Sequence, residues 1–264
     1  MPISTVTDSP ADLRRLIRMG ELVKPTAGMA PGFVQANLVV LPRAQAFDFL
    51  LFCQRNPKPC PLLEVVEAGS AEPKGMAPGA DLRSDISKYR VFENGEPVSE
   101  PGDISDIWTD DLVSFLLGCS FTFEAALERV GIPLRHIEKG TNVPMYVTSI
   151  PTAPAGAFSG PTVVSMRPVS REKVVRAVQV TSRFPAVHGA PIHIGDPQAI
   201  GITDISAPDL GDPVEVLDGE VPVFWACGVT PQAVAMSSRP PLMITHSPGH
   251  MFVTDGHDED YAVV

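Results

Sequence analysis

The sequence predicts an α/β protein, a three-layer sandwich with a mainly parallel or mixed sheet, plus a smaller inserted two-layer α+β domain. Residues 37–66 read as buried strand, helix, polar loop and buried strand, and residues 221–245 repeat this alternation of strands and helix. Residues 112–190 read as helix, strand, strand and helix with apolar faces of their own. We therefore expect a larger discontinuous domain, residues 1–111 and 191–264, and a smaller domain, residues 112–190.

Local signals place the individual elements. Ser9 followed by Pro10 is typical of a helix start, and Asn94-Gly95 after an apolar strand is typical of a type I′ hairpin turn. The remaining patterns predict helices at 43–54, 110–117, 121–130 and 231–238, and strands at 37–41, 62–66, 143–150, 162–166, 221–226 and 242–245.

Composition narrows the class of protein. The net charge of −11, without a cluster of lysine and arginine, argues against a nucleic-acid partner. No apolar run approaches the ~20 residues that span a bilayer, so we expect no membrane partner. The first residues show no signal-peptide pattern, and the four cysteines show no C-x-x-C spacing. These features predict a cytoplasmic protein with reduced thiols.

The loop of residues 55–61 holds three prolines, so its polar side chains are held in place. Arg55 and Asn56 in this loop are candidate substrate-binding residues. An arginine fork matches a carboxylate better than lysine does, and Arg183, before a turn, and Arg167, at a strand end, are further candidates. Asp196 could orient a histidine or act as a base, although an Asx-Pro turn explains it almost as well.

Two groups of histidines lie in Gly/Pro turns, where side chains face solvent or ligand rather than a core. We expect acid–base catalysis from His188, His193, His246 and His250, because imidazole titrates near neutral pH. A divalent metal held by histidines with Asp196 or Asp255 is an alternative, but no established ligand spacing is present. Local hydrogen bonds within the turns are the third interpretation.

Cys119 follows a glycine and precedes a predicted helix, so its thiol is a candidate catalytic group. The helix dipole would lower the pKa of such a thiol, and the free N–H groups there could bind an oxyanion. Packing beneath the helix is the competing interpretation. For Ser120, Thr122 and Glu124 a capping box is the simpler explanation.

Several long blocks resemble one family. They are residues 28–66, Ala77–Arg83, Gly118–Glu124, Arg183–Pro197 and Thr245–His250. The chain resembles bacterial hydro-lyases related to the D-glutamate cyclase of mitochondria, and the resemblance covers nearly its whole length.

That resemblance implies a carbon–oxygen lyase of amino-acid metabolism that acts on a small carboxylic or amino acid, with D-glutamate to 5-oxo-D-proline as the reaction of the related cyclase. Neither a dinucleotide-binding nor a P-loop pattern is present, so we expect no cofactor. The alternatives are a thiol- or metal-dependent amide or lactam hydrolase and a non-catalytic small-acid-binding protein. A homo-oligomer, such as a homodimer, is the expected assembly.

Overall fold

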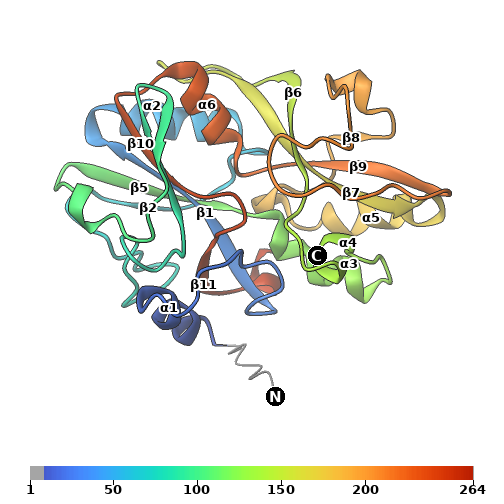
Figure 1. The fold of residues 1–264 in the computed structure, drawn as a ribbon, viewed down its shortest axis with the longest axis horizontal. Helices are drawn as coiled ribbons and strands as arrows, with labels where there is room; N and C mark the ends of the chain where they lie inside the picture. Colours follow the sequence, from blue (N-terminus) through green and yellow to red (C-terminus); the bar gives the residue numbers. More distant parts are fainter. Residues whose placement is uncertain (1–8, 264) are drawn as a thin grey trace.

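The computed structural model describes residues 9–263 as a chain folded around two separate sheets (Figure 1). The larger sheet has seven strands in the order β2-β5-β1-β10-β3-β4, with β11 also paired to β1. These strands are β1 Phe33–Pro42, β2 Leu62–Val66, β3 Tyr89–Glu93, β4 Glu96–Ser99, β5 Leu112–Gly118, β10 Leu242–His246 and β11 Phe252–His257. The smaller sheet, in the order β6-β7-β9-β8, contains β6 Met145–Pro151, β7 Pro161–Ser170, β8 His193–Ile194 and β9 Glu220–Ala226.

Six α-helices accompany the sheets in the part of the chain that the structure describes. The helices α2 (Arg43–Arg55) and α6 (Thr230–Ser238) pack on one face of the larger sheet, where Phe49, Phe52 and Val234 are fully buried. Its other face is covered by the loop that joins β2 to β3. The helices α3 (Glu124–Arg129) and α5 (Val174–Thr181) pack on the smaller sheet, and the remaining two are α1 (Pro10–Arg18) and α4 (Arg135–Glu138).

The sequence predicted a three-layer sandwich with a mainly parallel or mixed sheet, and this prediction of the sheet is wrong, because every recorded strand pairing is antiparallel. The strand–helix–strand unit of β1, α2 and β2 is present, and both of its strands run antiparallel to β5, which lies between them. The order of strands and helices along the chain therefore did not determine which strands pair in the sheet. The α/β class itself is confirmed.

The helix predicted at 110–117 is a strand, β5, and all seven of its residues are buried. A strand buried on both faces carries an unbroken apolar run, which has no period that separates it from a buried helix. β5 belongs to the larger sheet, whereas β8 and β9 belong to the smaller one. How the strands divide between two sheets does not test the predicted domain boundaries. The larger domain, 1–111 with 191–264, and the smaller domain, 112–190, stay a prediction.

Other local predictions are confirmed. Ser9 accepts a hydrogen bond from the backbone N–H of Asp12 and caps α1. Asn94 and Gly95 have φ angles of 51° and 83° and form the turn between β3 and β4. No helix within residues 9–263 is long and apolar enough to cross a membrane.

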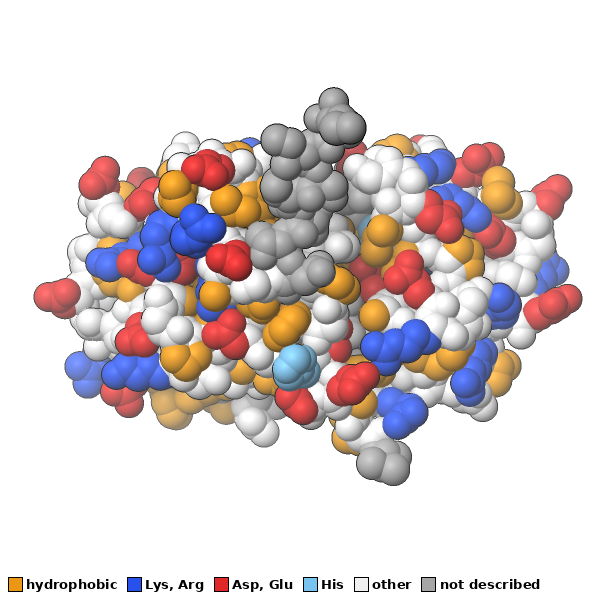
Figure 2. All heavy atoms as spheres, turned by 90° about the horizontal axis from the view of Figure 1, so that it is seen from below, with side chains coloured by type: hydrophobic (Ala, Val, Ile, Leu, Met, Phe, Trp, Pro, Cys, Tyr) orange, Lys and Arg blue, Asp and Glu red, His pale blue; other side chains and the backbone are white. Residues whose placement is uncertain are grey.

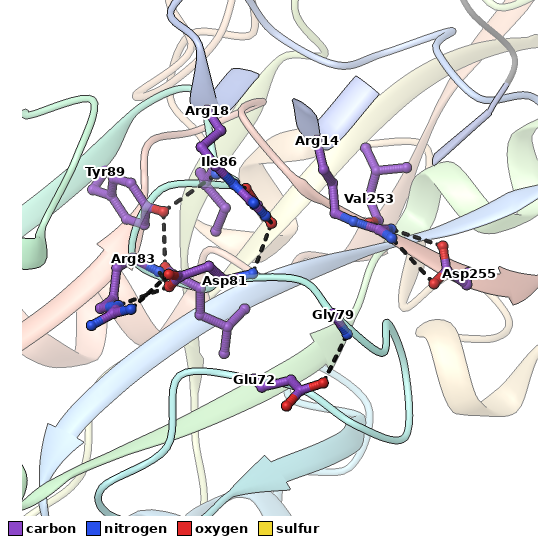
Figure 3. Close-up of polar contacts among 12 residues, drawn as sticks. Arg14, Arg18, Glu72, Gly79, Asp81, Arg83, Ile86, Tyr89, Val253 and Asp255 are labelled. Carbon is purple, nitrogen blue, oxygen red and sulfur yellow. Dashed lines mark hydrogen bonds and ion pairs between the residues drawn. The ribbon is translucent and has the colours of Figure 1, made fainter. Parts of the chain in front are cut away.

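The helix α1 is held to the larger sheet by arginines (Figure 3). Arg14 donates to both carboxylate oxygens of Asp255, at 2.9 and 3.1 Å, and to the carbonyl of Val253. Arg18 donates to both oxygens of Asp85, at 2.7 and 2.6 Å. These pairs fix the helix against β11 and against the loop before β3.

Candidate active site at the junction of the two sheets

Arg167, in the middle of β7, lies at the centre of a buried polar cluster between the sheets. Its side chain is 1% exposed. It donates to Glu124 Oε1 from Nε at 3.0 Å and from Nη2 at 2.5 Å, and it donates to the hydroxyls of Ser120 and Ser165 at 2.9 and 3.1 Å. We call Arg167, Glu124, Ser120, Cys119 and His188 the junction cluster.

Aromatic rings and a second imidazole complete the surroundings of Arg167. Its guanidinium lies 5.5 Å from the ring centres of both Phe123 and Trp225. His136 places Nε2 3.1 Å from Glu124 Oε1. Burial acts to raise the pKa of Glu124, but Arg167 and His136 outweigh it, and the pKa is lowered. Glu124 is therefore an ionised carboxylate at neutral pH.

Close backbone packing brings the two sheets together at this point. A Cβ at Gly118, the last residue of β5, would lie 2.6 Å from the carbonyl oxygen of Ala186, so only glycine lets the turn before His188 pack there. A Cβ at Gly228 would collide with the side chain of Asn37. Asn37 in turn donates to the carbonyl of Gly118 at 2.7 Å. These contacts place Cys119 and His188 beside Arg167.

His188 is the buried base of the cluster. Its backbone is left-handed, with φ of 82°, and its side chain is 1% exposed. Nδ1 lies 2.7 Å from the carbonyl oxygen of Lys58, which can only accept, so the neutral ring carries its proton on Nδ1. Nε2 is buried and has no partner that meets hydrogen-bond geometry, although the backbone of Gly118 lies close enough to the ring to act on its pKa. Burial, with the charge of Arg167, lowers the pKa of His188 to about 4, so Nε2 is an unprotonated acceptor at neutral pH.

The predicted low pKa of Cys119 is wrong in this structure. Burial raises the pKa of the Cys119 thiol, although the N–H of Phe121 donates to its sulfur at 3.5 Å. The residues after it, Ser120–Phe123, form a short 3-10 turn rather than an α-helix, so little dipole opposes the burial. Cys227 is close enough to influence Cys119, and burial raises its own pKa to about 11. Both groups are protonated thiols at neutral pH.

Arg55 and Asn56 line a cavity of about 350 Å³ beside the cluster, which we call the basic cavity. Lys58 lines it too, and burial lowers the pKa of that ammonium. Arg55 is exposed and donates to the carbonyl of Pro154 at 2.5 Å. Asn56 is held at the end of α2 by hydrogen bonds to Phe52 and Ala153. The smaller sheet contributes Thr162 and Ala226 to the opposite wall.

His193 and Asp196 lie in a turn away from the cluster. His193 Nε2 is 2.6 Å from the carbonyl of Asp196, and its ring packs on Phe224. Phe224 and Trp225 are neighbours on β9, so their side chains point to opposite faces of the sheet and His193 lies on the face away from Arg167. The exposed Asp196 accepts from the N–H of Gln198. Local turn formation explains this pair of contacts.

His246 and His250 lie in the larger sheet and the loop after it. His246 Nδ1 accepts the N–H of Leu38 at 3.2 Å, so the neutral ring carries its proton on Nε2, which is buried without a partner. Burial lowers the pKa of His246 to about 3. His250 is half-buried, with Nδ1 2.8 Å from the hydroxyl of Ser87, and burial lowers its pKa as well. The free proton of His246 makes it a donor, in contrast to His188.

Arg183 does not face the junction cluster. It is exposed, donates from Nε to the carbonyl of Val263 at 3.1 Å, and lines a different cavity between α3 and α5. Among residues 9–263 no group of three or more His, Cys, Asp and Glu side chains is placed to hold a metal ion. Asp255, considered above as a ligand, is paired with Arg14.

The sequence interpretation missed two members of the site, Glu124 and His136. Glu124 was assigned to a capping box, but its carboxylate turns inward to Arg167. A usable signal was present, because a single arginine in the apolar strand 161–170 requires a buried carboxylate partner. Nothing in the local sequence indicated His136.

Comparisons with known proteins identify the family of this chain. A family model described as D-glutamate cyclase matches residues 113–255. A protein of Geobacillus kaustophilus named "Putative hydro-lyase" is 66% identical over 97% of both chains. A relative of the same description from Stutzerimonas stutzeri is 63% identical over 97% of both chains. Another, from Bacillus subtilis, is 62% identical over 97% of this chain and 100% of its own. The chain belongs to the D-glutamate cyclase family.

A solved structure aligns more weakly. The nitrogen repressor-like protein of Methanococcus jannaschii is 10% identical over 92% of this chain and 97% of that one, with a TM-score of 0.38.

Proposed function

We propose that the protein is a hydro-lyase that acts on a small carboxylic or amino acid, with the cyclisation of D-glutamate to 5-oxo-D-proline as its reference reaction. The description of the matching family and the names of the relatives support this class. One observation in the structure carries the choice of site, namely the buried, unpartnered Nε2 of His188 beside Arg167. A fixed neutral imidazole with a free lone pair can accept a proton.

The reference reaction balances without a further reactant. The amino nitrogen of the substrate forms a bond to the γ-carboxyl carbon, and one carbon–oxygen bond of that carboxyl breaks. Two protons of the ammonium group leave with the released oxygen as water. Because nucleophile and electrophile belong to one molecule, holding the chain folded supplies a high effective molarity.

The basic cavity supplies the carboxylate-binding groups. Arg55 and Lys58 both line it, and their charges oppose the protein's net charge of −11. The fork of Arg55 can hold a carboxylate with two parallel hydrogen bonds. Lys58 links the cavity to the base, because its carbonyl accepts the Nδ1 proton of His188.

The junction cluster supplies the proton-transfer groups. His188 Nε2 accepts a proton from the ammonium group, and a bound carboxylate nearby would raise its pKa from about 4 towards the working pH. The protonated His188 then gives this proton to the leaving oxygen, and the second ammonium proton follows by the same route, so that the neutral histidine is restored. Cys119, whose raised pKa keeps it a neutral thiol, can donate a hydrogen bond to that oxygen without losing its proton. Arg167 acts through Glu124 and His188 as a positioning residue, because four of its five N–H groups are already used within the protein.

Mass-spectrometric turnover of a panel of D- and L-amino acids and hydroxy acids tests the proposal. We expect one or more of these acids to lose water in the presence of the protein. Calorimetric binding without any turnover would contradict the lyase and favour an acid-binding protein. The cytoplasmic location, the role in amino-acid metabolism and the homodimer remain proposals.

A further inference from the structure

A second cavity of about 440 Å³ lies between α3, α5 and the C-terminal 3-10 turn Asp258–Tyr261. Its size falls within the ~300–1,000 Å³ usual for small-molecule sites. We call it the arginine cavity, because Arg129, Arg176 and Arg183 all line it. Figure 2 shows blue lysine and arginine side chains mixed with red acidic ones on both halves of the face seen from below.

The three arginines are poorly matched by internal partners. Arg129 makes an ion pair with Glu259 at 3.3 Å, and both side chains are well exposed. Arg183 uses Nε for the carbonyl of Val263, a contact that leaves its two Nη groups available. Arg176 has no side-chain partner within residues 9–263. The cavity therefore presents guanidinium N–H groups that can bind an anion.

Two buried polar groups on the cavity wall also lack partners. Thr122 is 1% exposed, and its hydroxyl makes no hydrogen bond within the part of the chain that the structure describes. Asp258 is 6% exposed, and its Oδ1 is likewise unpartnered there. Buried polar groups are almost always hydrogen-bonded, so the hydroxyl of Thr122 is free to donate to a bound ligand. Burial raises the pKa of Asp258 to about 7, and this carboxyl can donate to an anion only in its protonated form.

The rest of the wall is apolar, with Ala126, Val130, Val180 and Phe184 lining it. An apolar wall with cations beside it fits a molecule that has a hydrocarbon body and an anionic head. None of the five residues of the junction cluster lines this cavity.

We propose that the arginine cavity is a binding site for an amphipathic anion, with its carboxylate or phosphate on Arg176 and Arg183 and its hydrocarbon body on Val130, Val180 and Phe184. The site is independent of the proposed lyase reaction. Carboxylate and phosphate share the chemistry that a guanidinium fork recognises, so the choice between the two head groups is left to measurement.

Isothermal titration calorimetry with four probes tests this site. Octanoate and octyl phosphate carry both features, whereas acetate and inorganic phosphate carry the head group alone. We expect at least one of the eight-carbon probes to bind roughly tenfold or more tightly than its short counterpart, because each buried CH₂ contributes about 0.8 kcal/mol. Equal affinity of long and short probes, or no binding of any of them, would overturn the proposal.

Variants locate the bound probe. Replacing Arg176 and Arg183 together by Gln should weaken binding by roughly tenfold or more. The matched control, Arg171→Gln with Lys139→Gln, removes the same charge from exposed positions outside the cavity and should bind as the unaltered protein does. Ala126→Phe fills the cavity without a change in charge and should also abolish binding. If the control loses as much affinity as the cavity variants, the site is wrong.

Discussion

The junction cluster and the attachment of α1 use the same ion pair in different surroundings. In each, one arginine donates two N–H groups to a buried carboxylate: Arg167 to Glu124, which is 5% exposed, and Arg18 to Asp85, which is 0% exposed. The arginines differ, because the side chain of Arg18 is 46% exposed and that of Arg167 is 1% exposed. Water can therefore solvate one guanidinium and not the other.

The neighbours of the two pairs differ as well. Asp85 also accepts the N–H of Asp81 at 2.8 Å, so its carboxylate is fully used in holding the fold (Figure 3 shows the surrounding contacts). Arg167 influences His188, whose Nε2 has no partner, and Cys119, whose thiol is kept protonated. Polar groups without partners beside the buried charge of Arg167 are typical of a functional site. The pair of Arg18 and Asp85, whose carboxylate is fully hydrogen-bonded, stabilises the fold instead.

Breaking the buried pair should have the largest effect on stability. Glu124→Ala leaves the guanidinium of Arg167 buried without a counter-charge, and we expect the free energy of unfolding to fall by about 3–5 kcal/mol. Urea denaturation at pH 7 measures this change. A loss no larger than that of an exposed pair would show that Arg167 is solvated or already compensated, and the comparison would fail.

Acid should destabilise the protein through the junction cluster. The pKa of His188 is lowered to about 4 in the folded protein from the usual 6.5, so its stabilising contribution is complete above pH 6.5 and is lost as the pH falls towards 4. His246, with a pKa of about 3, acts in the same direction. Asp258, whose pKa is raised to about 7, acts in the opposite direction as it protonates between pH 7 and its unfolded value.

A variant isolates the histidine contribution. His188→Asn suits the left-handed backbone at this position, since asparagine tolerates it. The difference in unfolding free energy between the protein and this variant should shrink by about 1.4 kcal/mol for each pH unit between 6.5 and about 4, and then level off. Parallel curves of stability against pH would mean that His188 is not held neutral.

The pair of Arg18 and Asp85, with its half-exposed arginine, should have an intermediate effect on stability. Asp85→Ala removes an equally buried carboxylate, but Arg18 can then reach water, and only the N–H of Asp81 loses a partner. We expect a loss of about 1–3 kcal/mol, smaller than that of Glu124→Ala. Unfolding of the two variants side by side decides the order, and a reversed order would show that the exposure of the arginine does not control the cost.

The smallest effect is expected at a fully exposed pair. Arg239 and Glu96 lie 2.9 Å apart, with side chains 66% and 69% exposed. Glu96→Gln should change the free energy of unfolding by less than about 0.5 kcal/mol, because solvent screens the pair. A larger loss in the same urea titration would indicate a role for Glu96 beyond this ion pair.

Local patterns allowed part of this fold to be predicted. The unit of β1, α2 and β2 and the Asn94-Gly95 turn follow from periodicity and turn chemistry within a few residues. The strand β5 was mistaken for a helix because its apolar run has no period. The antiparallel neighbours were missed because β1 pairs with β10, about 200 residues away, and no local signal specifies such a contact.

The candidate site could also be predicted only in part, because some of its contacts join residues far apart in the sequence. Cys119, His188 and Arg167 were selected from the sequence by residue type and setting, and the fold brings them together. Glu124 was missed because the residue that explains it, Arg167, lies 43 positions away. His193 was selected for the same Gly/Pro-turn setting as His188, and Asp196 as a group that could orient a histidine or act as a base. Only the sheet geometry separates them from His188. Their roles, like those of His246, His250 and Arg183, stay predictions.

Turnover by His188→Asn tests the central claim most directly, with His257→Asn as a control at an exposed histidine. The comparison uses whichever acid of the panel loses water and follows the dehydrated product by mass spectrometry, after far-UV circular dichroism has shown that both variants are folded. If the unpartnered Nε2 is the base, His188→Asn should lower kcat by roughly 10²–10⁴, and His257→Asn should leave it unchanged. A His188→Asn variant as active as the His257→Asn control would contradict the assignment of the junction cluster as the active site.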